Sequence, residues 1–365
     1  MPVKKFMSAT DQLSHLRKRK LKIDRDNIFL DYVEANNYFN VINGIEEILI
    51  PDPSKGKIFN TENFNDFIRL HEFDKEISGI ILSLIRKFES KLKTAVSIHF
   101  SELYCRTINN TMQYTNKKNY VDPRSGKNYR KTYFLYEHQS GAIVNKFDEF
   151  IFFNKSANNY LQNLEKQNDF IDSNTFYINQ PYSAPAGCCS HNKLVVPLWV
   201  SIELLDFGAL KRMCHYLDPN VMNEVLSDFS LQAGDRDLFL NSLDVINELR
   251  NKCAHFNLVG RFVTSSNIGI LNVLQNKLSL KPGRSPRMVK VPGGKKYYKG
   301  ASQLRLYDTL KVLNMYIDLQ DLKKPFKKII YKNNKCFKKG NYDLNMRLLQ
   351  LMGEPSYKEW KKLFS

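Results

Sequence analysis

The chain has 365 residues, of which 42% are hydrophobic and 12% aromatic, and this composition excludes an intrinsically disordered protein. Its six cysteines lack a paired spacing, and the most apolar stretch, residues 194–210, is interrupted by Pro197, Glu203 and Asp206, which excludes a disulfide-stapled secreted domain and an ordinary membrane span. The sequence shows no signal-peptide pattern, so we expect a soluble cytoplasmic protein.

The net charge of +18 is concentrated in one part of the chain. Residues 276–365 carry 22 Lys and Arg against 6 Asp and Glu, so this last quarter accounts for +16 of the total. Tyr and Phe are interleaved with the basic residues, a pattern that favours a phosphate-binding surface and therefore a nucleic acid partner. The alternative is a solvated, lysine-rich face.

Apolar residues recur at helical spacing and strand-like alternation is scarce, which predicts an all-α fold. In chain order, helices are expected over residues 10–19, 26–39, 64–104, 140–164, 198–217, 220–229, 235–255 and 302–331. The longest helix carries a core stripe formed by Ile77, Ile81, Leu84, Phe88, Leu92 and Val96. Residues 280–300, rich in Pro, Gly and Lys, are expected to form a linker or hairpin.

Three parts follow from this pattern. Residues 1–60 form an N-terminal helical segment, and residues 61–275 form the helical core. A basic, tyrosine-rich loop at residues 109–133 is inserted in the core, and it is either a solvated insertion or a contact surface for RNA. Residues 276–365 form a basic C-terminal extension that we expect to bind RNA.

The segment Glu248–His255 carries the candidate chemistry. Arg250 is followed five positions later by His255, a pairing that has little weight alone because short motifs often match by chance. Asp235 can cap the helix that carries them. Arg250 projects close to the apolar side of this helix, so we expect it either to pair with a carboxylate or to line a cleft. The apolar side is formed by Phe239, Leu243, Ile246, Leu249 and Cys253.

One copy of this helix would not aim both side chains at one atom, because five residues correspond to roughly 140° around a helix. Two copies that meet across a twofold axis would bring an Arg and a His from each chain into one cleft, so a homodimer is expected. Asn251, one turn before His255, is placed to hydrogen-bond to the imidazole and orient it.

Such a site can cleave RNA without a metal. His255 would take the proton of a ribose 2′-hydroxyl or protonate the leaving 5′-oxygen, and Arg250 would offset the charge of the phosphorane. We expect no metal and no other cofactor, because no His, Cys or Asp group has metal-ligand spacing. Alone, the pair is better explained by an Arg and a His that cap and bridge helix ends.

Several segments, in the expected order, resemble the Abi family of abortive-infection proteins (AbiD/AbiF-like). Residues 250–255 resemble its R-N-x-C-A-H signature, whose Arg and His are the R-x4–6-H pair of HEPN ribonucleases. Residues 196–208 resemble the family's P-x-W-x-x-x-E-x-x-[ST]-F-G helix, with Asp206 in place of Ser or Thr. Residues 37–44 are similar to the N-Y-Y-x-x-I-N-G form of AbiF-like members.

Further segments carry the same resemblance. Residues 73–76 and 89–93 resemble the family's central helix, and residues 352–355 with Trp360 resemble its M-G-x-P…W ending. Phe256 departs from the pattern, because many relatives carry a second His there. That departure weakens any mechanism that needs two adjacent imidazoles and leaves Arg250 and His255 intact.

The resemblance implies a HEPN-type helical bundle with additional N-terminal helices and a basic C-terminal helical extension, paired about the motif. It implies a toxin that aborts phage infection by damaging RNA, and for AbiF-like members a small structured noncoding RNA that restrains the protein. The candidate RNA-binding residues are Lys117, Lys118, Arg124, Lys127, Arg130 and Lys131 in the loop, and Lys295, Lys296, Tyr297, Tyr298, Lys299, Lys323, Lys324, Lys327, Lys328, Lys335, Lys338 and Lys339 in the extension.

Two other classes of function remain open. In the first, the protein binds RNA without cleaving it and uses the Arg250–His255 motif for binding or dimerisation. In the second, it is a DNA-binding regulator, which is less favoured because no helix-turn-helix lies beside the basic segment.

Overall fold

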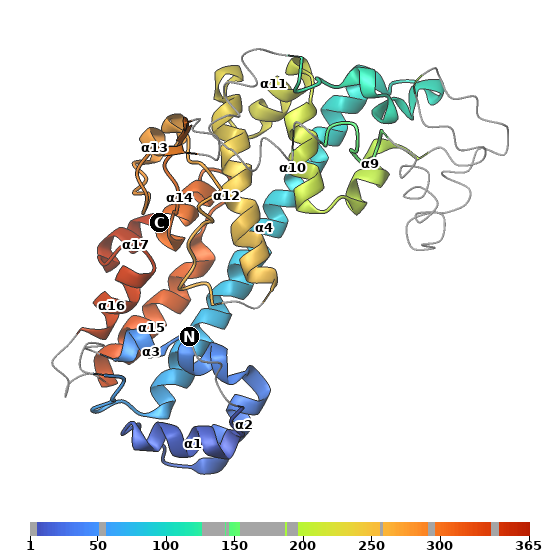
Figure 1. The fold of residues 1–365 in the computed structure, drawn as a ribbon. Coiled ribbons are helices and arrows are strands. Elements are labelled where there is room, and N and C mark those ends of the chain that lie inside the picture. Colours follow the sequence, from blue (N-terminus) through green and yellow to red (C-terminus); the bar gives the residue numbers. More distant parts are fainter. Residues whose placement is uncertain are drawn as a thin grey trace. The chain divides into compact units, whose positions relative to one another are not determined.

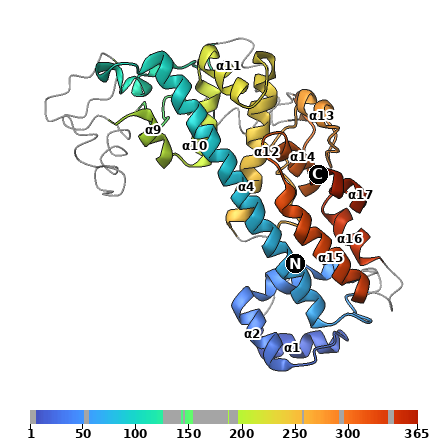
Figure 2. The same ribbon diagram turned by 180° about the vertical axis from the view of Figure 1, so that it is seen from behind.

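The computed structural model describes residues 6–50, 56–125, 143, 146–153, 187, 196–255, 258–290, 296–336 and 343–365. These residues are mostly helical, which confirms the all-α prediction (Figures 1 and 2). The α-helices are α1 (Ala9–Lys18), α2 (Asp26–Asn36), α3 (Glu46–Leu49), α4 (Phe64–Tyr104), α9 (Leu198–Ser201), α10 (Phe207–Tyr216), α11 (Pro219–Asp228), α12 (Arg236–Ala254), α13 (Asn272–Leu278), α14 (Leu306–Asn314), α15 (Lys323–Cys336), α16 (Leu344–Leu351) and α17 (Tyr357–Leu363).

The chain divides into two compact units that alternate along the sequence. The first consists of Met1–Leu84, Leu249–Val263 and Arg305–Ser365, and the second of Ile85–Glu248 and Thr264–Leu304. The sequence predicts three consecutive parts, residues 1–60, 61–275 and 276–365, and this division remains a prediction. The boundaries of the two compact units lie at other positions. The Arg250–His255 motif belongs to the first unit together with the N-terminal helices and α14 to α17.

The longest helix, α4, spans the residues expected from the sequence. All six residues of its predicted stripe, from Ile77 to Val96, are at most 2% exposed. Burial of one such side chain contributes about 1.5–3 kcal/mol. The six buried residues therefore outweigh the cost, about 1 kcal/mol, of Gly79 inside the helix.

Two predicted helices differ from the structure: one ends early, and the other is interrupted by the start of a new helix. The helix expected over residues 26–39 ends at Asn36, because Asn37 adopts a positive φ of 60°. The helix expected over residues 198–217 divides into α9, a 3₁₀ turn over Ile202–Leu204 and α10. Asp206 begins the new helix by accepting the Ala209 N–H at 2.6 Å.

Three further expectations concern residues 140–164, 280–300 and 302–331. Most of the first range lies outside the described residues; within it Ile143 is helical and residues 146–153 form turns and bends. The hairpin expected in residues 280–300 is present, with β1 (Arg287–Lys290) antiparallel to β2 (Lys296–Lys299). The last range is not one helix as expected: it holds α14, a 3₁₀ turn over Gln320–Leu322 and the first part of α15.

In the first unit, α15 packs its apolar side against α4 and α17. The ring of Phe326 meets Phe73 of α4 edge to face at 5.2 Å and stacks on Trp360 of α17 at 4.7 Å. All three rings are buried, so they form a core beneath the basic face of α15. Among the described residues, no helix is long and apolar enough to cross a bilayer.

Candidate functional site

The last turn of α12 carries the predicted motif. Leu249 and Cys253 are buried, and the Cys253 thiol is hydrogen-bonded to the Ser78 side chain on α4. Burial raises the pKa of Cys253 to about 12, although the bond from Ser78 lowers it. Cys253 is therefore a protonated structural thiol at neutral pH and not a nucleophile.

Arg250 and His255 present their side chains beside this buried anchor. Arg250 is partly exposed, and its Nη1 donates to Oδ1 of Asn251 at 3.3 Å. His255 is exposed and follows directly after Ala254, the last residue of α12, with its backbone N–H bonded to the Asn251 carbonyl at 3.1 Å. Both side chains are accessible to a ligand.

Two details bear on the expected roles of Asn251 and Arg250, and only the first differs from expectation. Within the described residues Asn251 makes no hydrogen bond to the His255 ring, and its side chain instead engages Arg250. Arg250 has no carboxylate partner in the described parts of the chain. It needs none, because its side chain is only partly buried and water can solvate the charge. Neither detail tests the expected pairing of two motifs across a twofold axis.

The loop after the motif is fixed by Asp74 of α4. The Asp74 carboxylate is 8% exposed and accepts the backbone N–H groups of Val259, at 2.9 Å, and Gly260, at 2.6 Å. Burial raises the pKa of Asp74 to about 6, while these two hydrogen bonds and the charge of Lys252 lower it. The sequence predicts a helix at Asp74 but indicates no partner for its side chain, because the hydrogen bond to Val259 spans 185 residues along the chain.

The same loop contacts the segment at residues 37–44. A Cβ atom on Gly44 would lie 1.9 Å from Cδ1 of Leu258 and 2.5 Å from the Asn40 carbonyl oxygen, so any other residue would force these neighbours to move. Arg261 donates to the carbonyl of Asn43 at 3.2 Å and to the Glu47 carboxylate at 2.8 Å. The segment following His255 is thus held from two sides, by α4 and by the turn before α3.

A second polar group connects α2 with α4. Oη of Tyr32 lies 2.8 Å from Nδ1 of His71 and donates to the Glu72 carboxylate at 2.6 Å. Burial and the nearby Lys75 lower the pKa of His71, so its imidazole is neutral near pH 7. These residues lie on different helices, and no sequence spacing indicated their contact.

The basic candidates fall into two groups. In the loop, Lys117, Lys118 and Arg124 are all exposed; Lys117 and Arg124 pair with Asp148, which partly neutralises them, whereas Lys118 has no ion-pair partner among the described residues. Lys127, Arg130, Lys131, Lys295, Lys338 and Lys339 lie outside the described residues, and only the backbone is described for Lys296, Tyr297 and Tyr298 of β2. Lys299 ends β2 and is partly exposed.

The other group is the exposed face of α15. The exposed lysines of this helix are Lys323, Lys324, Lys327, Lys328, Lys332 and Lys335. Lys328 pairs with Glu76 of α4 at 3.3 Å, and Lys335 lies over the exposed Tyr331 ring at 4.6 Å. The face therefore combines a row of ammonium groups with an accessible aromatic ring, as expected of a surface that contacts phosphates and bases.

Comparison with known proteins identifies the family. Residues 30–259 match the family of Abi-like proteins. The chain belongs to this family. Membership connects this Abi-like protein with abortive infection, a form of phage defence. No curated protein and no solved structure matches the chain.

The family-like segments of this Abi-like protein contact one another within each unit. In the second unit, the buried Lys93 donates to the Glu203 carbonyl at 2.9 Å, which joins residues 89–93 to residues 196–208. Asp206 serves as an N-cap, a role that Ser, Thr and Asp all perform. In the first unit, Nε1 of the buried Trp360 donates to the Glu354 carbonyl at 2.7 Å. These landmarks stabilise the fold, and Arg250 and His255 are left with accessible functional groups.

Proposed function

We propose that this Abi-like protein is a HEPN-type, metal-independent endoribonuclease that acts as a toxin in the cytoplasm during abortive infection. The observation that supports it most is the position of Arg250 and His255. Both are accessible at the end of α12, while the loop that follows is held by Asp74. A pair that only capped a helix end would not need such a fixed support.

His255 carries the proton in this proposal. Its imidazole takes the proton of a ribose 2′-hydroxyl, the 2′-oxygen attacks the adjacent phosphorus, and the bond from phosphorus to the 5′-oxygen breaks. Arg250 neutralises the charge that develops on the phosphorane oxygens. The products are a 2′,3′-cyclic phosphate and a 5′-hydroxyl.

A second copy of the chain supplies the other proton transfer. Because Arg250 lies on α12 and His255 comes five positions later, directly after the last residue of this helix, one motif is not expected to direct both side chains at one phosphate. In a homodimer with twofold symmetry, His255 of one copy acts as base and that of the other protonates the leaving 5′-oxygen. Asn251 acts through Arg250, whose guanidinium it holds by the hydrogen bond described above.

The RNA partner is assigned to the exposed face of α15. Its lysines and Tyr331 bind a structured RNA, either a restraining noncoding RNA or the substrate. The basic loop is a second contact surface, in which the exposed Lys118 has no ion-pair partner among the described residues.

Alanine substitution of the motif tests the proposal. Arg250→Ala and His255→Ala should each abolish RNA cleavage and toxicity without loss of helical content, since each removes one group from the reacting phosphate. Arg86→Ala and His15→Ala are matched controls, because both residues are exposed and lie outside the motif. RNA binding with no cleavage by the unaltered protein would instead favour a non-catalytic RNA-binding protein.

A further inference from the structure

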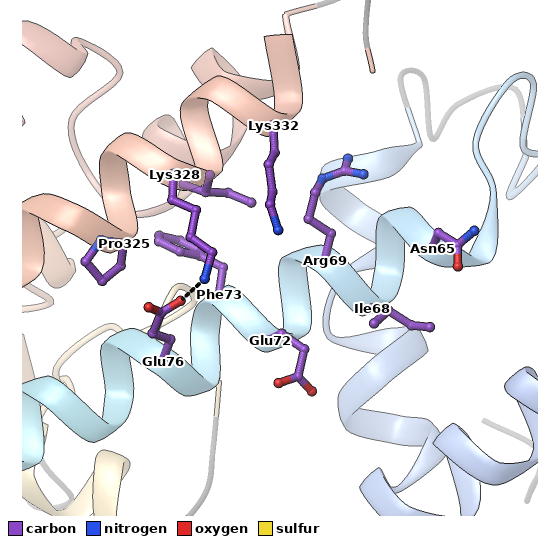
Figure 3. A pocket seen from close by; sticks show the side chains of 10 residues that line it. Asn65, Ile68, Arg69, Glu72, Phe73, Glu76, Pro325, Lys328 and Lys332 are labelled. Carbon is purple, nitrogen blue, oxygen red and sulfur yellow. Dashed lines mark hydrogen bonds and ion pairs between the residues drawn. The ribbon is translucent and has the colours of Figure 1, made fainter. Parts of the chain in front are cut away.

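A pocket of about 320 Å³ lies between α4 and α15 in the first unit (Figure 3). Its wall on α4 includes Ile68, Arg69 and Phe73, and its wall on α15 includes Lys328, Ile329 and Lys332. The volume is at the lower end of the range for small-molecule sites and accommodates one nucleotide rather than several.

The inner wall of the pocket is apolar. Phe73 and Ile329 are 5% and 3% exposed, and the Phe73 ring is fixed by its edge-to-face contact with Phe326. Ile68 is partly exposed at the α4 side. A flat, uncharged group such as a nucleobase or a ribose can therefore lie against this wall without desolvating an ion.

The charged residues that line the pocket are the cations Arg69, Lys328 and Lys332 and the carboxylates Glu72 and Glu76. The Arg69 side chain is 12% exposed and is held by Asp66, at 2.7 Å, and by Asn333, at 3.0 Å. Figure 3 shows the Lys332 side chain reaching from α15 toward α4 on the side of Arg69, and Lys328 joined to Glu76. Lys332 has no ion-pair partner among the described residues, so its ammonium group is available to an anion.

We infer that this pocket binds one nucleotide, with its phosphate beside Lys332 and Arg69 and its base against Phe73 and Ile329. An inorganic anion alone would make no contact with the apolar wall, and an uncharged ligand would make no ion pair with Lys332. The Glu76 carboxylate at the rim adds an acceptor for an amino group of the base. The nucleotide is either free or an unpaired residue of an RNA that lies along the lysines of α15.

This inference deepens the proposed RNA partnership but does not depend on cleavage at Arg250 and His255. The test of this inference measures the binding of a mononucleotide and involves no RNA cleavage. Loss of nucleotide binding and loss of RNA cleavage can therefore be observed separately.

The test uses AMP and UMP as probes and the full chain as the receptor. Binding is followed by saturation-transfer NMR for the unaltered protein and for two double variants of α15. Lys328→Gln with Lys332→Gln alters the pocket, and Lys324→Gln with Lys335→Gln removes the same charge from the same helix outside it. The pocket pair should weaken binding by about tenfold, which corresponds to about 1.4 kcal/mol, since the phosphate loses its charged contact with Lys332, and the control pair should change it little.

A third variant tests the apolar wall without changing charge. Ile68→Trp should fill the pocket and reduce AMP binding while the circular-dichroism spectrum stays unchanged. Competition then identifies the source of the nucleotide. Displacement of AMP by a hairpin RNA with one bulged nucleotide, but not by the same hairpin without it, assigns the pocket to RNA, and binding of AMP without such competition assigns it to a free nucleotide.

Three outcomes would overturn the inference. They are the absence of mononucleotide binding, an equal loss in the two double variants, and unchanged AMP affinity in a folded Ile68→Trp protein. An equal loss would mean that the lysines of α15 act only through their summed charge.

Discussion

The carboxylate of Asp74 lies 2.6 Å from the backbone nitrogen of Gly260, on the loop that follows the Arg250–His255 motif. A Cβ atom at residue 260 would lie 3.0 Å from Oδ1 of Asp74, so a side chain there would press on this bond. The contact holds the chain shortly after His255 against the central helix α4, and it assigns Asp74 a positioning role in the proposed site.

The first prediction is that Asp74→Ala destabilises the protein by about 1–3 kcal/mol, because two buried N–H groups lose their acceptor. Cleavage should fall as well, since the loop after His255 loses its support. The measurements are urea unfolding near pH 6 and RNA cleavage under conditions where the variant is folded. Asp31→Ala, at an exposed position of α2, is the control and should match the unaltered protein. Wild-type stability and cleavage in Asp74→Ala would remove the positioning role.

The second prediction concerns pH. Burial raises the pKa of Asp74 from its usual 3.8 to about 6, so the folded chain holds this proton more tightly than the unfolded chain. The contribution of Asp74 to stability is therefore full below about pH 4 and declines as the pH rises through 6. Relative to Asp74→Asn, which cannot ionise, the unaltered protein should lose on the order of 3 kcal/mol between pH 4 and pH 7. Urea unfolding across this range checks it, and parallel stability curves would disprove it.

The third prediction concerns the contact between Gly44 and Leu258. Gly44→Ala places a methyl group 1.9 Å from Cδ1 of Leu258 and 2.5 Å from the Asn40 carbonyl oxygen, so it should cost about 1–3 kcal/mol of stability. Leu258→Ala should restore part of that loss in the double variant, as a thermodynamic cycle would reveal. Gly79→Ala is the control, because a Cβ on this residue of α4 meets nothing within 4 Å. Strictly additive effects of the two substitutions would contradict the contact.

The fourth prediction separates RNA capture from RNA cutting. Replacement of Lys323, Lys324, Lys327 and Lys328 by Gln should lower RNA affinity and reduce the salt dependence of binding by a slope of about 3, because each neutralised phosphate releases counterions. Circular dichroism should stay unchanged, since all four side chains are exposed. Toxicity should rise if the bound RNA restrains the protein and fall if it is the substrate.

The control is a second fourfold variant with the same net charge as the α15 variant. Glutamine at the exposed Lys18, Lys22, Lys358 and Lys361 removes four positive charges outside α15. If the α15 variant binds RNA like this control, with an undiminished salt slope, the α15 lysines are a solvated face and Lys118 in the basic loop becomes the next position to test.

The sequence was sufficient to predict elements whose core stripes are long. The bounds of α4 agree with the prediction, because its apolar period continues from Phe64 to Phe100. The helix breaks were missed. Asn37 and Asp206 end or begin helices through a positive φ and a side-chain cap, and these local features interrupt a hydrophobic period that would otherwise continue.

The sequence reveals the Arg250–His255 motif but not the residues that hold the loop after it. Spacing and family resemblance identify Arg250 and His255, and both are accessible in the structure. Asp74 and Gly44 contact the loop after the motif from segments about 185 or more residues away, and such pairings leave no periodic signal in a single sequence. The contact of Asn251 with Arg250, rather than with His255, depends on side-chain directions at a helix end that spacing does not determine.

The most direct test of the central proposal is the chemistry of the cleaved ends. The purified protein is incubated with RNA in EDTA, and the products are analysed by mass spectrometry beside those of Arg250→Ala and His255→Ala. Cleavage should persist in EDTA, leave 2′,3′-cyclic phosphate and 5′-hydroxyl ends, and be lost in both variants. Strict dependence on Mg²⁺ with 5′-phosphate products, or full cleavage by a folded His255→Ala protein, would contradict it.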